Sequence, residues 1–174
     1  MSMIRTIFAY PNPELKKKSA TVSIITDSVR ELARDMVETM YDAPGVGLAA
    51  PQLGVHQRVI VIDISSRDEP ADLIIAINPV IVHASGESFE EEGCLSVPKY
   101  AANVRRHASV VVKALDLDGN EQTWHAEELL AVAFQHEIDH LEGILFVDHL
   151  SPLKRDLFKR KMRRMAELEA SEAK

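Results

Sequence analysis

The segment His136-Glu137-Ile138-Asp139-His140 is the part of the sequence best suited to do chemistry. On an α-helix, residues four apart lie about 40° apart around the axis and one turn apart along it. Both imidazoles can therefore reach one metal ion, and Glu137 can lie beside the metal's water without being a ligand. A Lewis acid, a nucleophile and a base then share one helical turn. The pattern predicts a hydrolytic metal site, and the alternative is a pair of core histidines satisfied by hydrogen bonds.

Two histidines do not complete a catalytic metal site, which normally has three protein ligands and a water. An extended form of this histidine motif has a third histidine six residues after the second. The chain does not contain it, because Phe146 occupies that position. We expect His149 to lie at the surface. We also expect the acidic residues of the polar C-terminal segment to be solvated: Glu167, Glu169 and Glu172.

Cys94 is the remaining candidate for the third ligand, and it is the only cysteine of the chain. The alternative role of a lone cysteine is that of a small buried hydrophobe. Three acidic residues, Glu90 to Glu92, stand directly before it. They would raise the pKa of the thiol unless a metal stabilises the thiolate, which argues against a free nucleophilic cysteine.

Three helices are expected to position these residues. The first opens at Thr26-Asp27-Ser28, where Ser28 has capping-box spacing to Glu31, and ends near Asp42 before Pro44 and Gly45. The second carries the two histidines and extends from about Glu127 to Glu142, with Gly143 as its C-cap. Its first half is apolar on nearly all sides, so we expect it to be buried. The third begins after Ser151-Pro152, with Leu153, Leu157 and Met162 on the face that packs on the domain.

Strands are expected between the first two helices. The predicted strands are rich in β-branched residues: Arg58–Ile64, Leu73–Asn78, Val80–His83 after Pro79, Ser109–Asp116 and Glu121–His125, the last two joined by a hairpin turn at Asp118-Gly119-Asn120. Strands and helices do not alternate regularly. We therefore predict an α+β fold, with small antiparallel or mixed sheets packed around a buried histidine-bearing helix and a C-terminal helix.

Composition limits the kind of protein that this can be. A chain of 174 residues, 46% hydrophobic and 27% charged, predicts one globular domain over 1–174, including a basic C-terminal helix from about 152. The net charge of −7 argues against general nucleic-acid binding. No apolar run approaches the ~20 residues that a membrane span needs. The N-terminus has no secretory apolar block, and a lone cysteine fits a reducing compartment, so we expect a cytoplasmic protein.

Three segments resemble the signature motifs of the peptide deformylases, and their order and spacing also match. These segments are Gly45 to Gln52, Glu92 to Ser96 and Gln135 to His140. The resemblance covers almost the whole chain. It implies a hydrolase that removes the formyl group from N-formylmethionyl peptides and releases formate.

The resemblance also implies roles for individual residues. Cys94, His136 and His140 would be the metal ligands, and Glu137 the general base. The side-chain amide of Gln52 and the backbone N–H of Leu95 would donate to the developing oxyanion.

The methionine side chain of the substrate needs an apolar pocket. The resemblance implies that Val46, Gly93, Leu129 and Val132 line it, and that the substrate backbone approaches Gly47. For Leu129 and Val132 the alternative is a place in the core.

Ligand chemistry and resemblance point to different metals. A Cys-His-His site suits zinc. Peptide deformylases more typically use ferrous iron, so we expect one Fe²⁺, which Zn²⁺ or Ni²⁺ can replace. Two other hypotheses stay open: a zinc peptidase with a different third ligand, and a module in which the metal only supports the fold.

The C-terminal helix is the remaining feature with a candidate function. Seven basic residues and one acid between Lys154 and Met165 give it a local charge of +6. This charge predicts either a solvated face or a phosphate-binding stripe. Because peptide deformylases act on nascent chains, the resemblance implies that such a stripe docks on ribosomal RNA. We expect the chain to be a monomer without membrane contact.

Overall fold

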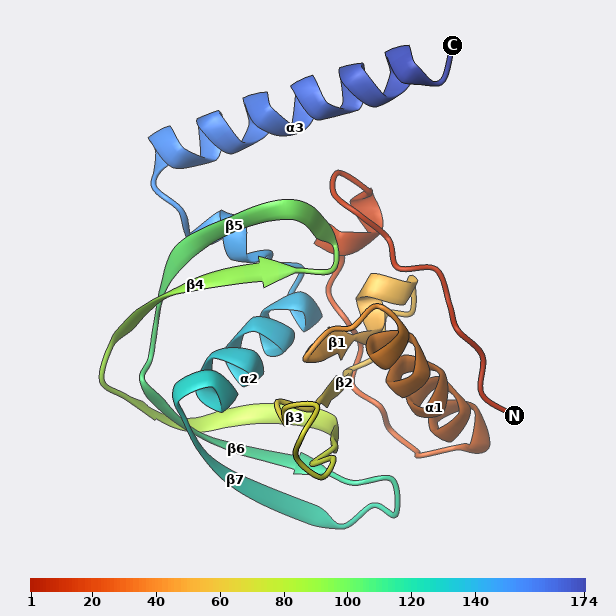
Figure 1. Ribbon diagram of the computed structural model, residues 1–174. Helices are drawn as coiled ribbons and strands as arrows, with labels where there is room; N and C mark the ends of the chain where they lie inside the picture. Colours follow the sequence, from red (N-terminus) through yellow and green to blue (C-terminus); the bar gives the residue numbers. More distant parts are fainter.

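The computed structural model describes residues 1–174 and has an antiparallel five-stranded sheet as its frame (Figure 1). The strands follow the order β1-β2-β3-β6-β7: Gly47–Ala49, Val59–Ile62, Ile74–Ser85, Ser109–Leu115 and Glu121–Glu127. A separate hairpin is formed by β4 (Ser88–Cys94) and β5 (Val97–Arg106). Three α-helices complete the fold: α1 (Asp27–Asp42), α2 (Glu128–Leu141) and α3 (Pro152–Glu172). The predicted α+β class is confirmed.

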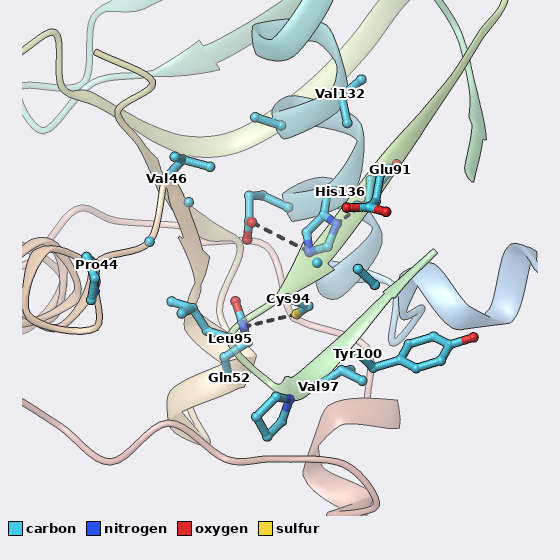
Figure 2. Close-up of a pocket in the computed structure, with 18 of the residues that line it drawn as sticks. Pro44, Val46, Gln52, Glu91, Cys94, Leu95, Val97, Tyr100, Val132 and His136 are labelled. Atoms are coloured by element: carbon cyan, nitrogen blue, oxygen red, sulfur yellow. Dashed lines mark hydrogen bonds and ion pairs between the residues drawn. The ribbon is translucent and has the colours of Figure 1, made fainter. Parts of the chain in front are cut away.

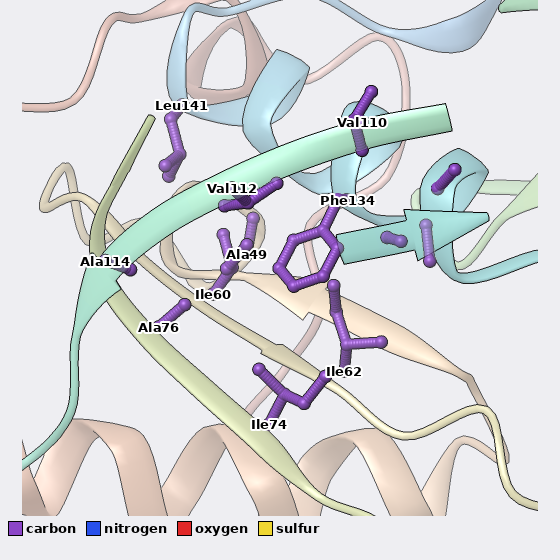
Figure 3. Packing of buried hydrophobic residues seen from close by; sticks show 13 residues of the cluster. Ala49, Ile60, Ile62, Ile74, Ala76, Val110, Val112, Ala114, Phe134 and Leu141 are labelled. Atoms are coloured by element: carbon purple, nitrogen blue, oxygen red, sulfur yellow. The ribbon is translucent and has the colours of Figure 1, made fainter. Parts of the chain in front are cut away.

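Helices cover both faces of the sheet at β2, and this explains why that strand is apolar throughout. All four of its residues are buried. Ile60 and Ile62 pack with Phe134 of α2 (Figure 3). Val59 and Val61 pack on the opposite face with Met36 of α1. The arrangement fixes α2 between the sheet and the β4–β5 hairpin (Figure 1).

Backbone geometry sets the C-terminal end of α2. Gly143 follows the helix with φ +74°, in the left-handed region that favours glycine. A Cβ at this position would collide with the Lys16 carbonyl oxygen, so the C-cap also depends on close approach of the N-terminal segment. The predicted helix from Glu127 to Glu142 is confirmed to within one residue at each end.

Two sequence predictions about element boundaries are wrong. The first helix is capped by Thr26, whose hydroxyl accepts a hydrogen bond from the Val29 N–H, and not by Ser28. Pro79 does not divide two strands, because β3 continues through it with a register shift between Ile77 and Val80. Asn78 adopts φ +54° at this bulge, and its side chain exchanges two hydrogen bonds with the backbone of Val22.

The C-terminal helix packs on the domain through Met162, as predicted, but not through Leu153 and Leu157. Leu153 and Leu157 are exposed, whereas Phe158 is buried against Tyr10 and Tyr100, with ring centroids 4.9 and 4.7 Å away. Beyond this anchor α3 extends away from the body (Figure 1). No helix of the chain is both long and apolar enough to cross a membrane.

Candidate active site

Three side chains converge where the β4–β5 hairpin meets α2. Cys94 ends β4, and His136 and His140 lie one turn apart on α2. One ligand atom of each lies within 4.8 Å of the other two, and Cys94 Sγ is 3.4 Å from His140 Nε2. A sulfur and two imidazole nitrogens are donors that suit zinc or another first-row transition metal. The residues fit a metal ion, and no fourth protein ligand joins the cluster, so a closed structural site is not supported.

Glu92 holds the first histidine in position. Its Oε1 lies 2.9 Å from His136 Nδ1, which directs Nε2 of that ring toward the cluster. Arg106 makes two hydrogen bonds to the same carboxylate, of 2.9 and 3.0 Å, and both side chains are 4% exposed. Burial alone would raise the pKa of Glu92, but the hydrogen bonds from His136 and Arg106 lower it below its usual value. Glu92 is therefore ionised and orients a candidate metal ligand.

The network continues on the far side of α2. Arg106 Nη1 is 2.6 Å from Asp139 Oδ2, and His149 Nε2 is 2.8 Å from the same oxygen. His149 is exposed, as expected, and is not part of the metal cluster. Sequence reasoning missed the roles of Glu92 and Arg106. The available signal was the carboxylate two residues before Cys94, because a metal-binding histidine usually donates its second N–H to such a group.

Glu137 lies beside the cluster in a space that a glycine keeps open. Its Oε1 is 3.9 Å from His136 Nε2, and its Oε2 is buried without a hydrogen-bond partner. A Cβ on Gly47 would lie 2.7 Å from Glu137 Oε1, so any larger residue would displace the carboxylate. Burial raises the pKa of Glu137 from 4.5 to about 7. A carboxyl with a pKa near neutrality is suited to take up and release a proton.

Gln52 is held with its amide nitrogen toward the cluster. Its Oε1 accepts a hydrogen bond from the Ala49 N–H at 2.9 Å. Its Nε2 donates to Ser96 Oγ at 3.0 Å and lies 3.7 Å from Cys94 Sγ. The side chain is 1% exposed and therefore fixed. Leu95 follows Cys94 in the turn between β4 and β5, and its side chain fills the space next to Gly45.

An open cleft of about 670 Å³ leads to this cluster (Figure 2). Its walls are the segment before β1, the β4–β5 hairpin and the first turns of α2. The residues expected to line a substrate pocket all line this cleft: Val46, Gly47, Gly93, Leu129 and Val132. Leu129 is 51% exposed, so it is not a core residue, and the prediction that the first half of α2 is buried is wrong at this turn. The helix is apolar here because it faces the cleft.

A cluster of one cysteine and two histidines, with a buried carboxylate beside it and a cleft in front, defines a metal-dependent hydrolase. The family model described as Polypeptide deformylase matches residues 4–156. The peptide deformylase of Syntrophobacter fumaroxidans is 53% identical over 161 residues, which cover 92% of this chain and 95% of that protein. The chain belongs to the polypeptide deformylase family. It removes the N-formyl group from the formylmethionine of nascent polypeptides and releases formate.

Solved structures agree with this assignment. The crystal structure of a peptide deformylase from Legionella pneumophila has a TM-score of 0.89 and 48% identity, and covers 97% of this chain and 98% of its own. A structure of the enzyme from Acinetobacter baumannii with Met-Ala-Ser bound has a TM-score of 0.80 and 35% identity, and covers 86% of this chain and all of its own.

Proposed function

We propose that Cys94, His136 and His140 hold the catalytic metal and that Glu137 is the general base. The observation that carries this proposal is the convergence of three ligand atoms within 4.8 Å beside a buried carboxylate whose Oε2 has no partner. When bound, the metal supplies Lewis-acid catalysis and lowers the pKa of a water. Glu137 accepts the proton as the water attacks the formyl carbon, and passes it to the leaving amine.

Two hydrogen-bond donors are proposed to stabilise the tetrahedral oxyanion. Gln52 Nε2 lies 3.7 Å from Cys94 Sγ and is fixed by Ala49 and Ser96, so its N–H groups are preorganised. The backbone N–H of Leu95 adjoins the cysteine, and no hydrogen bond within the chain uses it. Donors that need no rearrangement stabilise a transition state more than donors that must turn toward it.

The apolar part of the cleft is proposed to bind the methionine side chain. Val46 and Leu129 expose about half of their surface there, and Val132 lies one turn along α2 from Leu129. Gly93 adds no side chain to this wall. The Acinetobacter enzyme with Met-Ala-Ser bound supports an N-terminal methionine as the recognised residue. The formyl carbon bears only hydrogen, so a narrow end of the cleft can exclude larger acyl groups.

Fe²⁺ is the metal that we propose for this site, with Zn²⁺ or Ni²⁺ able to replace it. A thiolate and two imidazoles bind all three ions, so geometry alone does not choose among them. The choice of iron rests on the resemblance. Iron-loaded protein should lose activity in air more quickly than under anaerobic conditions, and nickel-loaded protein should keep it. Equal lifetimes of the iron-loaded enzyme with and without oxygen would exclude ferrous iron as the active ion.

We also propose the domain extent, oligomeric state, location and partner of the enzyme. The whole chain forms one catalytic domain over 1–174 and acts as a monomer in the cytoplasm. The basic helix α3 docks on the ribosome, where formylated nascent chains emerge. This last proposal is supported by the charge of α3 and by its extension away from the body (Figure 1).

Formate release from formyl-Met-Ala-Ser, measured together with metal content, tests the proposed site. Wild-type protein should bind one metal per chain and release formate. Cys94→Ser should bind the metal weakly and show no activity, because a serine hydroxyl is a poor ligand at neutral pH. Ser96→Ala is the matched control for metal content and should keep the metal, since Ser96 contacts Gln52 and not the metal cluster. Full metal content and activity in Cys94→Ser would place the third ligand elsewhere.

A further inference from the structure

Lys99 is the only exposed cation that lines the active-site cleft. The other charged residues of the lining, apart from His136, are Glu91, Glu92 and Glu137. Glu92 and Glu137 are buried. This leaves Lys99 and Glu91 as the exposed charges that a substrate meets. Neither forms an ion pair within the protein, so both are free to interact with a bound peptide.

The backbone places Lys99 at the cleft in an unusual way. Gly93 pairs with Ala101 and Cys94 pairs with Val97, so Pro98, Lys99 and Tyr100 form a bulge opposite the metal-binding end of β4. Lys99 adopts φ +62°, in the left-handed region where glycine is the usual residue. A lysine in this conformation is energetically costly, and such outliers suggest a functional constraint. The bulge brings a cation to the cleft that Cys94 and His136 also line.

A second cation lies close by. Lys161 of α3 places its Nζ 5.4 Å from the centroid of the Tyr100 ring, and Tyr100 also lines the cleft. Glu91 lies on β4 opposite Asn103, four residues beyond Lys99 on β5. The two exposed charges of the cleft are therefore separated along the hairpin, with Lys99 in the bulge and Glu91 three residues before Cys94.

We infer that Lys99 is a specificity-determining residue that favours formyl-peptides with an acidic side chain at the second or third position. The inference rests on the substrate orientation proposed above, with the formyl group at the metal cluster and the methionine side chain against Val46 and Leu129. An extended peptide advances about 3.3 Å per residue, so the next two side chains lie within the reach of a lysine that adjoins the metal-binding turn. Attraction there acts on bound substrate and transition state alike, and therefore lowers KM with little change in kcat.

Steady-state kinetics with matched peptides test this inference. The substrates are formyl-Met-Asp-Ala and formyl-Met-Ala-Asp, each with a lysine counterpart, at low salt. We expect kcat/KM of the wild type to favour aspartate over lysine by about two- to fivefold in at least one position, the range for an exposed ion pair. The preference should come from KM and should shrink at high salt.

Three variants locate the source of the preference. Lys99→Gln should bring the aspartate-to-lysine ratio close to one, and Lys99→Glu should reverse it. Glu91→Gln should increase it, because an acidic side chain would no longer be repelled. Lys113→Gln is the matched control, since Lys113 lies on β6 and does not line the cleft, and its ratio should equal that of the wild type.

Two results would overturn the inference: equal kcat/KM for all four peptides in the wild type, or an unchanged ratio in Lys99→Gln. Formate release from the neutral peptide formyl-Met-Ala-Ser by wild-type protein distinguishes failure of the proposed catalytic site from failure of the proposed role of Lys99. Its absence would contradict the proposed catalytic site, whereas its presence without any charge preference contradicts only the role of Lys99.

Discussion

His136 Nδ1 and Glu92 Oε1 are joined across 2.9 Å, although the two residues are 44 positions apart in the sequence. This contact links the β4–β5 hairpin to α2, the two elements that supply the three candidate ligands. Arg106 holds Glu92 from the other side, so the carboxylate cannot turn away from the histidine. The geometry of the metal cluster therefore depends on a buried ion pair that does not itself touch the metal.

Glu92→Gln should lower metal affinity by about 10- to 100-fold, the range for loss of a carboxylate that orients a metal-binding histidine. A glutamine keeps the size but is a weaker acceptor for the His136 N–H. Competition with a chelator measures the affinity. Asp139→Asn is the control, because it removes a charge from Arg106 without touching His136. Equal losses in the two variants would show that general weakening of the buried network, and not orientation of His136, is responsible.

Glu137→Gln should keep the metal and lose turnover by roughly 10²- to 10⁴-fold, because an amide cannot accept the proton that a general base takes up. The expected loss lies in kcat, since Glu137 acts on the reacting atoms. Formate release and metal content of the same preparation measure the two properties together. Turnover within twofold of the wild type would remove Glu137 from the mechanism.

Glu137→Gln should also change how the free energy of unfolding of the metal-free protein depends on pH. Burial raises the pKa of Glu137 from 4.5 to about 7, so between these values the folded state binds a proton that the unfolded chain has lost. The contribution of this carboxyl to the free energy of unfolding is then fully present below pH 4.5 and is lost as the pH rises through 7. Glu137→Gln should therefore be more stable than the wild type at pH 8, on the order of 2–3 kcal/mol, and equally stable near pH 4.5.

Urea unfolding of chelator-treated protein at both pH values measures this difference. Glu91→Gln is the control, because it removes a carboxylate from an exposed position on β4 that also lines the cleft. Its stability should follow that of the wild type at both pH values. A gain in Glu137→Gln that is equally large at pH 4.5 and at pH 8 would contradict a titration of this carboxyl and indicate a packing effect instead.

The catalytic helix could be predicted from sequence because its signals are local. Two histidines four residues apart, an apolar first half and a glycine after the last turn all lie within one stretch of chain. The prediction that this half is buried is nonetheless wrong at Leu129. Hydrophobic periodicity distinguishes apolar from polar surface, but it does not distinguish a core from an open apolar cleft. Leu129 is half exposed for that reason.

The β4–β5 hairpin could not be predicted from local pattern. Glu90 and Glu91 are exposed on β4, and glutamate has a low propensity for strands. The burial of Glu92 depends on Arg106, which is 14 residues away, and on His136, which is 44 residues away. Such partnerships exist only in the folded chain. The sequence alone also does not show that Phe158 anchors α3, because its ring packs between Tyr10 and Tyr100, which are both far from it in the sequence.

The basic helix α3 leads to a prediction about ribosome binding. Its stretch from Lys154 to Met165 carries seven basic residues and one acid, a charge of +6 in a chain of −7. Phe158 is its only buried residue, and Leu153, Leu157 and Leu168 are exposed. A helix fixed mainly at its start presents both its cations and its leucines to a partner. Binding to RNA phosphates would release counterions and therefore depend steeply on salt.

Changing Lys159, Arg160, Arg163 and Arg164 to glutamine should weaken co-sedimentation with ribosomes and make it less sensitive to salt. All four side chains are exposed and none forms an ion pair within the chain, so the fold should tolerate the changes. Turnover of a free formyl-peptide should stay unchanged, because none of them lines the cleft. A variant with Leu153 and Leu157 changed to glutamine separates charge from apolar contact: it should weaken binding without changing the salt slope. Unaltered co-sedimentation of the charge variant at low and moderate salt would show that the basic residues of α3 only form a solvated face.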